Sequence, residues 1–177
     1  MFRRLTDDDL PLMHRWLNDP GVVRWWEGDD VSWEGVVRDY GSASTDPVEY
    51  WLALADGAPV GWIQCYAVAD NLDDDEVKHW LDLGIKESAA GIDYLIGEPG
   101  SRGKGLGASM IQSFVHGVVF ANHPAWTQAC ASPYAANVAS CRALQKAGFT
   151  FVGAFEDPGD ADGPAHLYSI ERPATSL

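Results

Sequence analysis

The sequence predicts a single α/β or α+β domain that spans residues 1–177. Helix-like and strand-like segments alternate along the chain, and no linker, repeat or low-complexity stretch divides them. With 177 residues, 46% of them hydrophobic, the chain is long enough to bury a core of its own. A strand, a glycine-rich loop and an amphipathic helix follow one another over residues 91–120. We expect the domain to be organised around this unit.

The first helix expected in chain order begins after a capping sequence at residues 6–9. Leu10, Met13 and Leu17 recur on one helical face, and Pro20 lies just beyond its end. The chain is therefore predicted to open with a short amphipathic helix.

Two adjacent tryptophans, Trp25 and Trp26, precede a group of acids, Glu27, Asp29 and Asp30. A regular strand or helix cannot turn two adjacent side chains toward one core, so one tryptophan is expected on a surface loop. An aromatic face beside carboxylates suits a ring-shaped ligand that carries amines. Packing of one tryptophan in the core and of the other beneath a loop explains the pair equally well.

A β-hairpin is expected next. Residues 48–55 and 58–68 have the composition of strands, and Asp56-Gly57 between them is a strong turn signal. Because side chains alternate between the two faces of a strand, Gln64 and Tyr66 should share one face.

Residues 70–90 lack strong periodicity and are rich in Asp and Glu around Trp80. We predict an acidic loop with Trp80 embedded in it, directly before the central strand. Such a loop is suited to form one wall of a substrate cleft. An ordinary solvated surface loop is the alternative.

The glycine-rich loop has the features of an anion-binding site. A buried strand at residues 92–96 leads to it, and unpaired backbone N–H groups of the loop and of the next helical turn point outward. Gly103, Gly105 and Gly107 leave the backbone accessible, and Arg102 and Lys104 add positive charge. Neither the Walker pattern nor the Gly-x-Gly-x-x-Gly fingerprint is met. The apolar face of the helix that follows consists of Met110, Ile111, Phe114, Val115, Val118 and Val119.

Two further units complete the chain. A short strand at residues 126–131 is followed by Ser132-Pro133 and by a helix that begins at Asn137 and ends at Gly148. Residues 149–155 and 166–170 are predicted as the last two strands, joined by an acidic turn at residues 157–164.

The composition limits the classes of partner. Twenty-six acids against twelve bases give a net charge of −14, which opposes binding to nucleic acid or to an anionic membrane surface. Neither a membrane span of ~18 apolar residues nor a signal peptide is expected. Three cysteines without metal-ligand spacing favour a reduced, cytoplasmic protein that holds no metal. Either plain solubility or an acidic cleft for a polycation explains the charge.

Several stretches resemble the aminoglycoside 6'-N-acetyltransferases, a branch of the GNAT superfamily of N-acetyltransferases. They are RWWEG at residues 24–28, GWIQCY at 61–66, GID at 91–93, RGKGLG at 102–107, Asn137 with KAGF at 146–149, and DGPA at 162–165. The resemblance implies a single GNAT-type domain with a mixed central sheet of about six to seven strands flanked by helices. It also implies acetyl-CoA as the acetyl donor and a cationic aminoglycoside as the acceptor.

The same resemblance assigns residues to the two ligands. The residues implied in acceptor binding are Trp25, Trp26, Glu27, Gln64, Tyr66, Trp80, Asp93 and Ser132. Those implied in binding acetyl-CoA are Leu95, Ile96, Arg102, Gly103, Lys104, Gly105, Leu106, Gly107, Ala108 and Asn137.

Asp93 is the expected catalytic residue. Aminosugar amines are mostly protonated at neutral pH, so the reaction needs a carboxylate that binds the ammonium and accepts its proton, directly or through water. Ile92, Leu95 and Ile96 surround Asp93 with apolar side chains, and backbone N–H groups near Leu95 and Ile96 are expected to polarise the thioester. No Ser-His-acid or Cys-His pattern indicates an acyl-enzyme, so we expect direct transfer in a ternary complex.

Two positions depart from the family pattern. Ser132 stands where the family often has an Asp before proline, and Leu144 stands where many members have a tyrosine that protonates the leaving thiolate. The acceptor range and the proton donor therefore stay open. The alternatives are an N-acetyltransferase for lysine or hydroxylysine in siderophore assembly and a non-catalytic acetyl-CoA-binding module. Either a monomer or a homodimer agrees with the sequence.

Overall fold

The computed structural model describes residues 1–26, 29–156 and 163–174, which form one seven-stranded mixed sheet. The strand order is β1-β2-β3-β4-β5-β7-β6, and every neighbouring pair is antiparallel except β4 and β5, which are parallel. The strands are β1 (Phe2–Arg4), β2 (Val48–Ala55), β3 (Ala58–Ala67), β4 (Ala89–Ile96), β5 (Gln128–Ala131), β6 (Thr150–Phe155) and β7 (Ala165–Glu171). The predicted mixed sheet of an α+β domain is confirmed.

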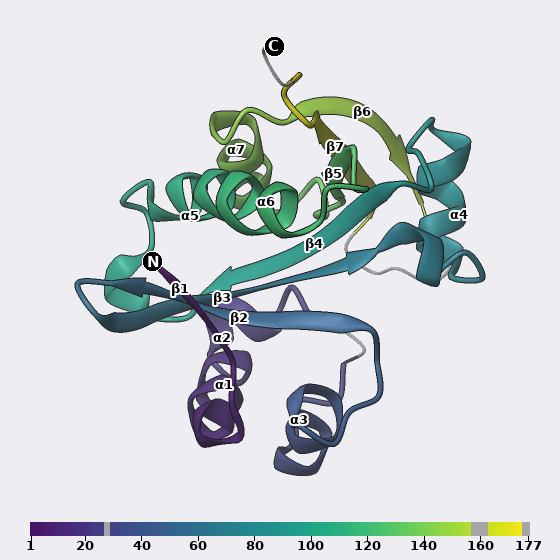
Figure 1. Ribbon diagram of the computed structural model, residues 1–177. Coiled ribbons are helices and arrows are strands. Elements are labelled where there is room, and N and C mark those ends of the chain that lie inside the picture. The colour runs from purple at the N-terminus through teal and green to yellow at the C-terminus, as the bar shows by residue number, and fades with distance from the viewer. Residues whose placement is uncertain (27–28, 157–162, 175–177) are drawn as a thin grey trace.

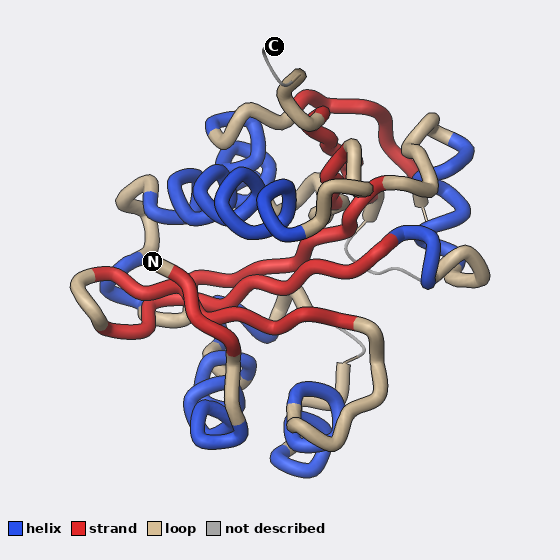
Figure 2. Tube along the Cα trace, viewed as in Figure 1, coloured by secondary structure: helices blue, strands red, loops and turns tan. Residues whose placement is uncertain are grey.

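Helices cover both faces of this sheet (Figure 1, Figure 2). The helices of the described residues are α1 (Leu10–Leu17), α2 (Pro20–Val23), α3 (Trp33–Tyr40), α4 (Asp75–Asp82), α5 (Leu106–Phe114), α6 (Phe120–Asn122) and α7 (Val138–Lys146). On one face α1, α2 and α3 pack against Trp62 and Leu95, and on the other α5 and α7 pack against Ile63 and Ile92. None of these helices is long and apolar enough to cross a membrane.

The central unit folds as the sequence predicts. Strand β4 leads through the glycine-rich loop to α5, and Met110, Ile111 and Phe114 are buried on the predicted face. The helix runs on through a π-helical turn, Val115–Val119, into α6, which keeps Val118 and Val119 buried as well.

The hairpin is also confirmed. Strands β2 and β3 meet in antiparallel register from Val48–Tyr66 to Ala55–Ala58. Asp56 and Gly57 both have positive φ, 49° and 81°. This pair of angles belongs to the tight turn whose twist matches that of the flanking strands, which is why Asp-Gly predicts it well.

The prediction of an acidic loop over residues 70–90 is wrong in its centre, where α4 forms. The Asp74 side chain accepts a hydrogen bond from the backbone N–H of Val77 (3.1 Å), and Asp75 and Glu76 occupy the first turn. Acids at these positions cap a helix and interact favourably with its dipole. Strand β1 and helices α2 and α3 were not predicted either: β1 and α2 have only three and four residues, and α3 has eight, with Ser32 as its N-cap.

Strands β4 and β5 separate part of the way along the sheet. Their pairing runs from Ala89–Gln128 to Gly91–Cys130, whereas β4 continues to Ile96. Beyond Gly91 the β4 edge therefore faces a gap, and the side chains of Asp93 and Tyr94 project on either side of a strand edge that β5 does not cover. This opening positions the candidate site.

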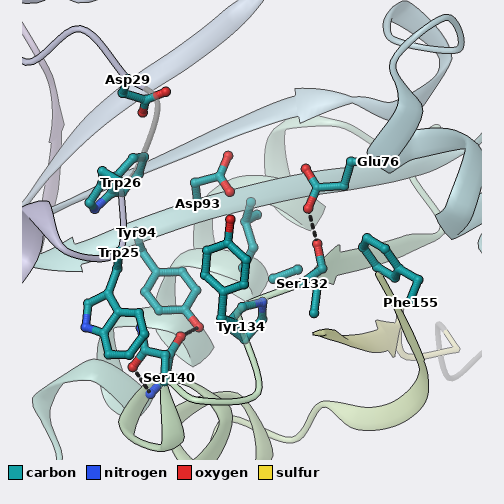
Figure 3. Close-up of a pocket in the computed structure, with 15 residues that line it drawn as sticks. Trp25, Trp26, Asp29, Glu76, Asp93, Tyr94, Ser132, Tyr134, Ser140 and Phe155 are labelled. Carbon is teal, nitrogen blue, oxygen red and sulfur yellow. Dashed lines mark hydrogen bonds between the residues drawn. The ribbon is translucent and has the colours of Figure 1, made fainter. Parts of the chain in front are cut away.

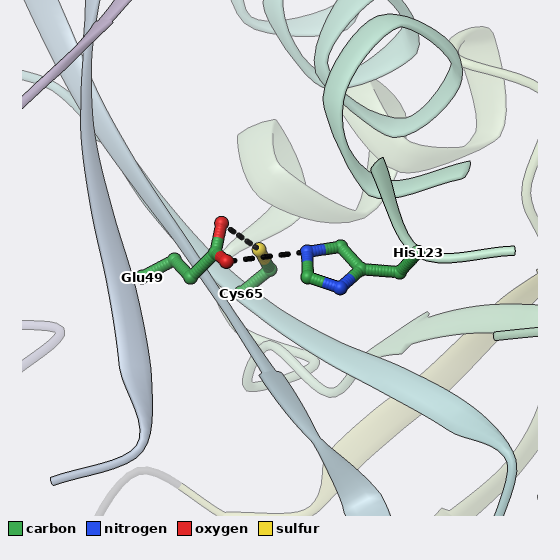
Figure 4. Close-up of side chains that lie close together, drawn as sticks. All are labelled: Glu49, Cys65 and His123. Carbon is green, nitrogen blue, oxygen red and sulfur yellow. Dashed lines mark hydrogen bonds and ion pairs between the residues drawn. The ribbon is translucent and has the colours of Figure 1, made fainter. Parts of the chain in front are cut away.

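A polar cluster of Glu49, Cys65 and His123 joins the sheet to the segment that follows α6 (Figure 4). The Glu49 carboxylate lies 3.0 Å from the guanidinium of Arg4 and 3.2 Å from Nε2 of His123, and it accepts hydrogen bonds from Trp51 Nε1 (3.2 Å) and Cys65 Sγ (3.9 Å). Burial and the nearby carboxylate raise the pKa of Cys65 to about 12. Because Arg4 and Trp51 already satisfy both carboxylate oxygens, the cluster joins β1, β2 and β3 to the segment that follows α6.

Candidate active site

Two connected cavities occupy the gap between β4 and β5. One has a volume of about 310 Å³ and the other about 440 Å³. Both are lined by Trp25, Trp26, Tyr94, Asn137 and Ser140, so they meet at these side chains. A group held in one cavity can therefore reach a group held in the other.

The two cavities have opposite charge. Among the described residues that line the smaller cavity, Asp29, Glu76 and Asp93 are acidic and none is basic. The larger cavity follows the glycine-rich loop and α7, and its described charged residues, Arg102, Arg142 and Lys146, are all basic. We call the first the acidic pocket and the second the basic groove.

Asp93 lies at the floor of the acidic pocket (Figure 3). Gln64 Nε2 donates a 2.6 Å hydrogen bond to its Oδ2, and the Tyr66 hydroxyl bonds the same carboxylate. Desolvation by burial is the main reason why the pKa of Asp93 is raised, and the charge of Asp29 adds to this, whereas the bonds from Gln64 and Tyr66 oppose it. A carboxyl group with a raised pKa is better suited to accept a proton from an ammonium.

Gly91 explains how these side chains come together. A Cβ at position 91 would lie 2.4 Å from the Tyr66 ring, so only glycine lets that ring lie across β4. Gln64 pairs with Asp93 in the register of β3 and β4, and Tyr66 pairs with Gly91. The Gly-Ile-Asp and Gln-x-Tyr patterns are thus two halves of one arrangement.

Trp80 does not line the acidic pocket, and its predicted contact with the acceptor is corrected. Its ring is 1% exposed in the core beneath β5 and β7, because α4 is a helix that turns this residue inward. Its Nε1 donates a 3.0 Å hydrogen bond to Ser132 Oγ, and Ser132 in turn donates to Glu76 Oε1. Trp80 therefore supports Ser132 and Glu76, which do line the pocket (Figure 3).

Trp25 and Trp26 both line the junction of the two cavities. Trp25 and Trp26 follow α2 in a turn, and both rings are half-buried where the two cavities meet. Trp26 packs edge-on against Trp62 at 5.6 Å, and the Arg24 guanidinium lies 4.2 Å from the centre of the Trp25 ring. One tryptophan was expected on a surface loop; both lie in the turn after α2, and Trp26 packs against the core residues beneath it. Glu27 and residues 157–162 of the acidic turn predicted at 157–164 lie outside the described residues.

The glycine-rich loop forms one end of the basic groove. Gly103 and Gly105 have φ angles of 73° and 79°, and Gly105 immediately precedes α5. Every residue implied in binding acetyl-CoA lines this groove except Lys104, which is exposed beside it: these are Leu95, Ile96, Arg102, Gly103, Gly105, Leu106, Gly107, Ala108 and Asn137. The backbone N–H groups at the start of α5 suit a phosphate.

Arg102 serves the loop differently from the prediction that it brings charge to an anion. Its guanidinium donates to Asp19 Oδ1 (2.8 Å) and to the carbonyl oxygens of Ile96 (2.9 Å) and Gly97 (2.8 Å). Asp19 compensates the charge, so Arg102 fixes the loop against β4 and α2. Within the part of the chain that the structure describes, the cations of the groove without an acidic partner come from α7, as Arg142 and Lys146, and the sequence analysis did not predict them.

Three hydroxyl-bearing residues of the site were also missed. The hydroxyl groups of Tyr94 and Ser140 lie 2.7 Å apart where the cavities meet, and Tyr134 lines the acidic pocket (Figure 3). Strand alternation next to Asp93 could have indicated Tyr94. Leu144, by contrast, is 0% exposed and packs in the main core.

Comparisons with known proteins agree with this geometry. Residues 6–157 match the family described as acetyltransferase (GNAT) domain. Aminoglycoside N(6')-acetyltransferases type 1 of Klebsiella pneumoniae and Serratia marcescens are each 29% identical over 173 residues, which cover 96% of this chain and 81% of the relative.

Solved structures give the same result. AAC(6')-Ib in complex with parmomycin and acetyl-CoA has a TM-score of 0.81 and 28% identity, covering 97% of this chain and 93% of that one. AAC(6')-Ib with coenzyme A and kanamycin has a TM-score of 0.79 at the same identity, covering 97% and 94%. The structure of an aminoglycoside N(6')-acetyltransferase from Legionella pneumophila, at 18% identity and a TM-score of 0.73, shares the fold.

Proposed function

This chain belongs to the acetyltransferase (GNAT) family, and we propose that it transfers the acetyl group of acetyl-CoA to the 6'-amine of an aminoglycoside. One observation carries the choice of acceptor: an acidic pocket opens into a basic groove on a chain of net charge −14. Acetyl-CoA is an anion because of its phosphates, and an aminoglycoside is a polycation. The two cavities separate the two ligands by charge and let them meet at the tryptophan pair.

The residues of the groove fit the donor. The backbone at Gly103 and Gly105 and the first turn of α5 accept the pyrophosphate, and Arg142 and Lys146 add charge along α7. Bound acetyl-CoA supplies an activated acetyl thioester. Backbone N–H groups of β4 near Leu95 and Ile96, on the edge that β5 does not cover, polarise its carbonyl.

Asp93 performs the proton chemistry. Its carboxylate binds the incoming ammonium, takes one proton, and leaves a neutral amine that attacks the thioester directly. Gln64 and Tyr66 hold the carboxylate in place, and Asp29 raises its pKa further. Asp29 and Glu76 lie on other elements of the pocket and bind further ammonium groups of the same acceptor.

The spread of the carboxylates distinguishes the acceptor classes. Lysine and hydroxylysine present one side-chain amine, which Asp93 alone would serve. Carboxylates from three separate segments suit an acceptor with several amines on more than one ring. This spread supports an aminoglycoside over a small monoamine.

The test follows free thiol while the protein and acetyl-CoA are incubated with kanamycin, hydroxylysine or a polyamine. We expect release with kanamycin and little with the other two. Asp93→Asn should keep acetyl-CoA affinity and lower kcat by roughly 10²–10⁴-fold, the usual contribution of a positioned base. Asp70→Asn, a change of the same charge at an exposed position away from the pocket, is the matched control.

Four outcomes would contradict parts of the proposal. Thiol release with hydroxylysine alone would replace the acceptor, and tight acetyl-CoA binding without release from any amine would indicate a binding module. Full activity of Asp93→Asn at neutral pH would remove Asp93 from the mechanism. A loss confined to KM would make Asp93 an ammonium anchor only.

A further inference from the structure

The departing thiolate lacks a partner at the position where the family resemblance implies one. Leu144 stands there, it is fully buried in the main core, and it lines neither the acidic pocket nor the basic groove. A leucine side chain has no hydrogen to donate. Any stabilisation of the thiolate must come from another side chain.

Tyr94 reaches the same helix, α7, from β4. Its hydroxyl lies 2.7 Å from Ser140 Oγ, on α7. Ser140 precedes Leu144 by four residues, so the two positions are one turn apart on one face of the helix. The tyrosine hydroxyl therefore meets α7 one turn before position 144.

This pair also lies where the acetyl group must pass. Tyr94 and Ser140 both line the acidic pocket and the basic groove, and Figure 3 shows the Tyr94 ring running from β4 toward Ser140 beside Trp25. Tyr94 directly follows Asp93, so the two side chains leave β4 on opposite sides. The proposed proton acceptor and the tyrosine hydroxyl thus flank the passage between the cavities.

We propose that Tyr94 donates the hydrogen bond that stabilises the departing thiolate of CoA, and that Ser140 orients its hydroxyl. The proposal rests on the acetyl transfer proposed above. The new C–N bond forms while the C–S bond breaks with its electron pair on sulfur. Asp93 has already taken one proton from the ammonium, and the second nitrogen proton passes to water as the amide forms. Tyr94 keeps its proton, and the thiolate takes one from water after release. Ser140 donates to the Tyr94 oxygen, which leaves the tyrosine O–H free to point at sulfur.

A donor that keeps its proton agrees with the surroundings of Tyr94. Burial raises the pKa of its hydroxyl, as do Cys141, Asp93 and Tyr168, and only the bond with Ser140 opposes this. A free thiol has a pKa of about 8.5, below that of tyrosine, so a hydrogen bond is the stable state rather than complete transfer. Asn137 holds Ser140 in place by accepting a hydrogen bond from its backbone N–H (3.2 Å).

The test measures how CoA binding depends on pH, without any acceptor. A hydrogen bond to sulfur favours the thiolate, so wild-type affinity for CoA should rise between about pH 6.5 and pH 9 as the thiol ionises. In Tyr94→Phe the pKa of the bound thiol should increase by about one to two units, and the rise should be lost. Affinity for desulfo-CoA, which lacks the sulfur, should be the same in both proteins at every pH.

Two further variants sharpen the test. Tyr134→Phe removes a hydroxyl from the acidic pocket alone and should leave the pKa of bound CoA unchanged. Ser140→Ala should shift it in the same direction as Tyr94→Phe but by less, because the tyrosine hydroxyl remains. With acetyl-CoA and kanamycin, Tyr94→Phe should lower kcat by about 10–100-fold at unchanged acetyl-CoA affinity.

An unchanged pH dependence of CoA affinity in Tyr94→Phe overturns the proposal, even if kcat falls, because the effect would then be structural. A shift in Tyr134→Phe instead would assign the role to Tyr134. Since these titrations contain no acceptor, they decide the role of Tyr94 whether or not an aminoglycoside is acetylated. If kanamycin releases no thiol but Tyr94→Phe shows the expected loss of pH dependence in CoA binding, only the proposed acceptor is overturned.

Discussion

Gly105 offers the sharpest test of the basic groove. Its φ of 79° lies in the left-handed region, and a Cβ built there meets no atom within 4 Å. An alanine would therefore cost about 1–2 kcal/mol of backbone strain without any clash. Its methyl group would stand at the start of α5, between a bound phosphate and the backbone N–H groups. Losing one such charged hydrogen bond corresponds to about 1.5–3 kcal/mol, or roughly a 10–150-fold weaker Kd for acetyl-CoA.

Gly57 provides the matched control for Gly105→Ala. It has nearly the same φ, 81°, and the same open surroundings, but it lies in the hairpin turn between β2 and β3. Both alanine variants should lower Tm by a similar amount, about 2–8 °C for a chain of this size. Only Gly105→Ala should lose acetyl-CoA affinity in a calorimetric titration. A Kd in Gly105→Ala within about twofold of that in Gly57→Ala would refute the assignment of the loop.

Three other changes test the site and the core. Leu144→Tyr should lower the free energy of unfolding by about 1–3 kcal/mol, because Leu144 is fully buried and a larger side chain overpacks the core. It should raise kcat less than about tenfold. A large gain in kcat would mean that the native site lacks a proton donor. Because the pKa of Asp93 is raised above 3.8, Asp93 holds its proton more tightly in the native protein than in the unfolded chain. Its contribution to stability is therefore present at low pH and is lost as the pH rises through the native pKa. The Tm of Asp93→Asn minus that of wild type should therefore be larger at about pH 8 than at about pH 4. The same difference at both pH values would contradict burial as the cause of the raised pKa. KM for kanamycin should increase with ionic strength, since attraction between partly exposed charges is screened over about 8–10 Å, and a salt-independent KM would exclude the acidic pocket as its site.

The sequence predicts the elements whose signals are local. The Asp56-Gly57 turn, the run from β4 through the glycine-rich loop to α5, and the cap of α7 at Asn137 all depend on residues close together in the chain. Helix α4 also begins with a local signal, the Asp74 cap. The sequence nevertheless predicts a loop there, because a group of acids resembles a solvated segment and only Val77 and Trp80 are buried on the helix.

In the candidate site, too, the sequence predicts the residues with local patterns and misses the long-range contacts. Gln64, Tyr66 and Asp93 follow from strand alternation and from short patterns, and the structure brings them together. Two other contacts depend on residues far apart in the sequence: Arg102 meets Asp19 from 83 positions away, and Tyr94 meets Ser140 from 46 positions away. No spacing within one segment indicates such pairs. The ion pair of Arg102 with Asp19 and the contact of Tyr94 with Ser140 were therefore not predicted.

Charge separation explains why composition alone could not identify the function. A net charge of −14 opposes an anionic ligand when it is averaged over the chain, yet the proposed donor carries phosphates. The described residues resolve this conflict locally: Asp19 compensates Arg102, while Arg142 and Lys146 face the groove. On the other side of Tyr94, the carboxylates of Asp29, Glu76 and Asp93 line the acidic pocket. The overall negative charge then assists only the binding of the acceptor, because it attracts a polycation over long range. Acetyl-CoA instead depends on short-range contacts with the glycine-rich loop and α7.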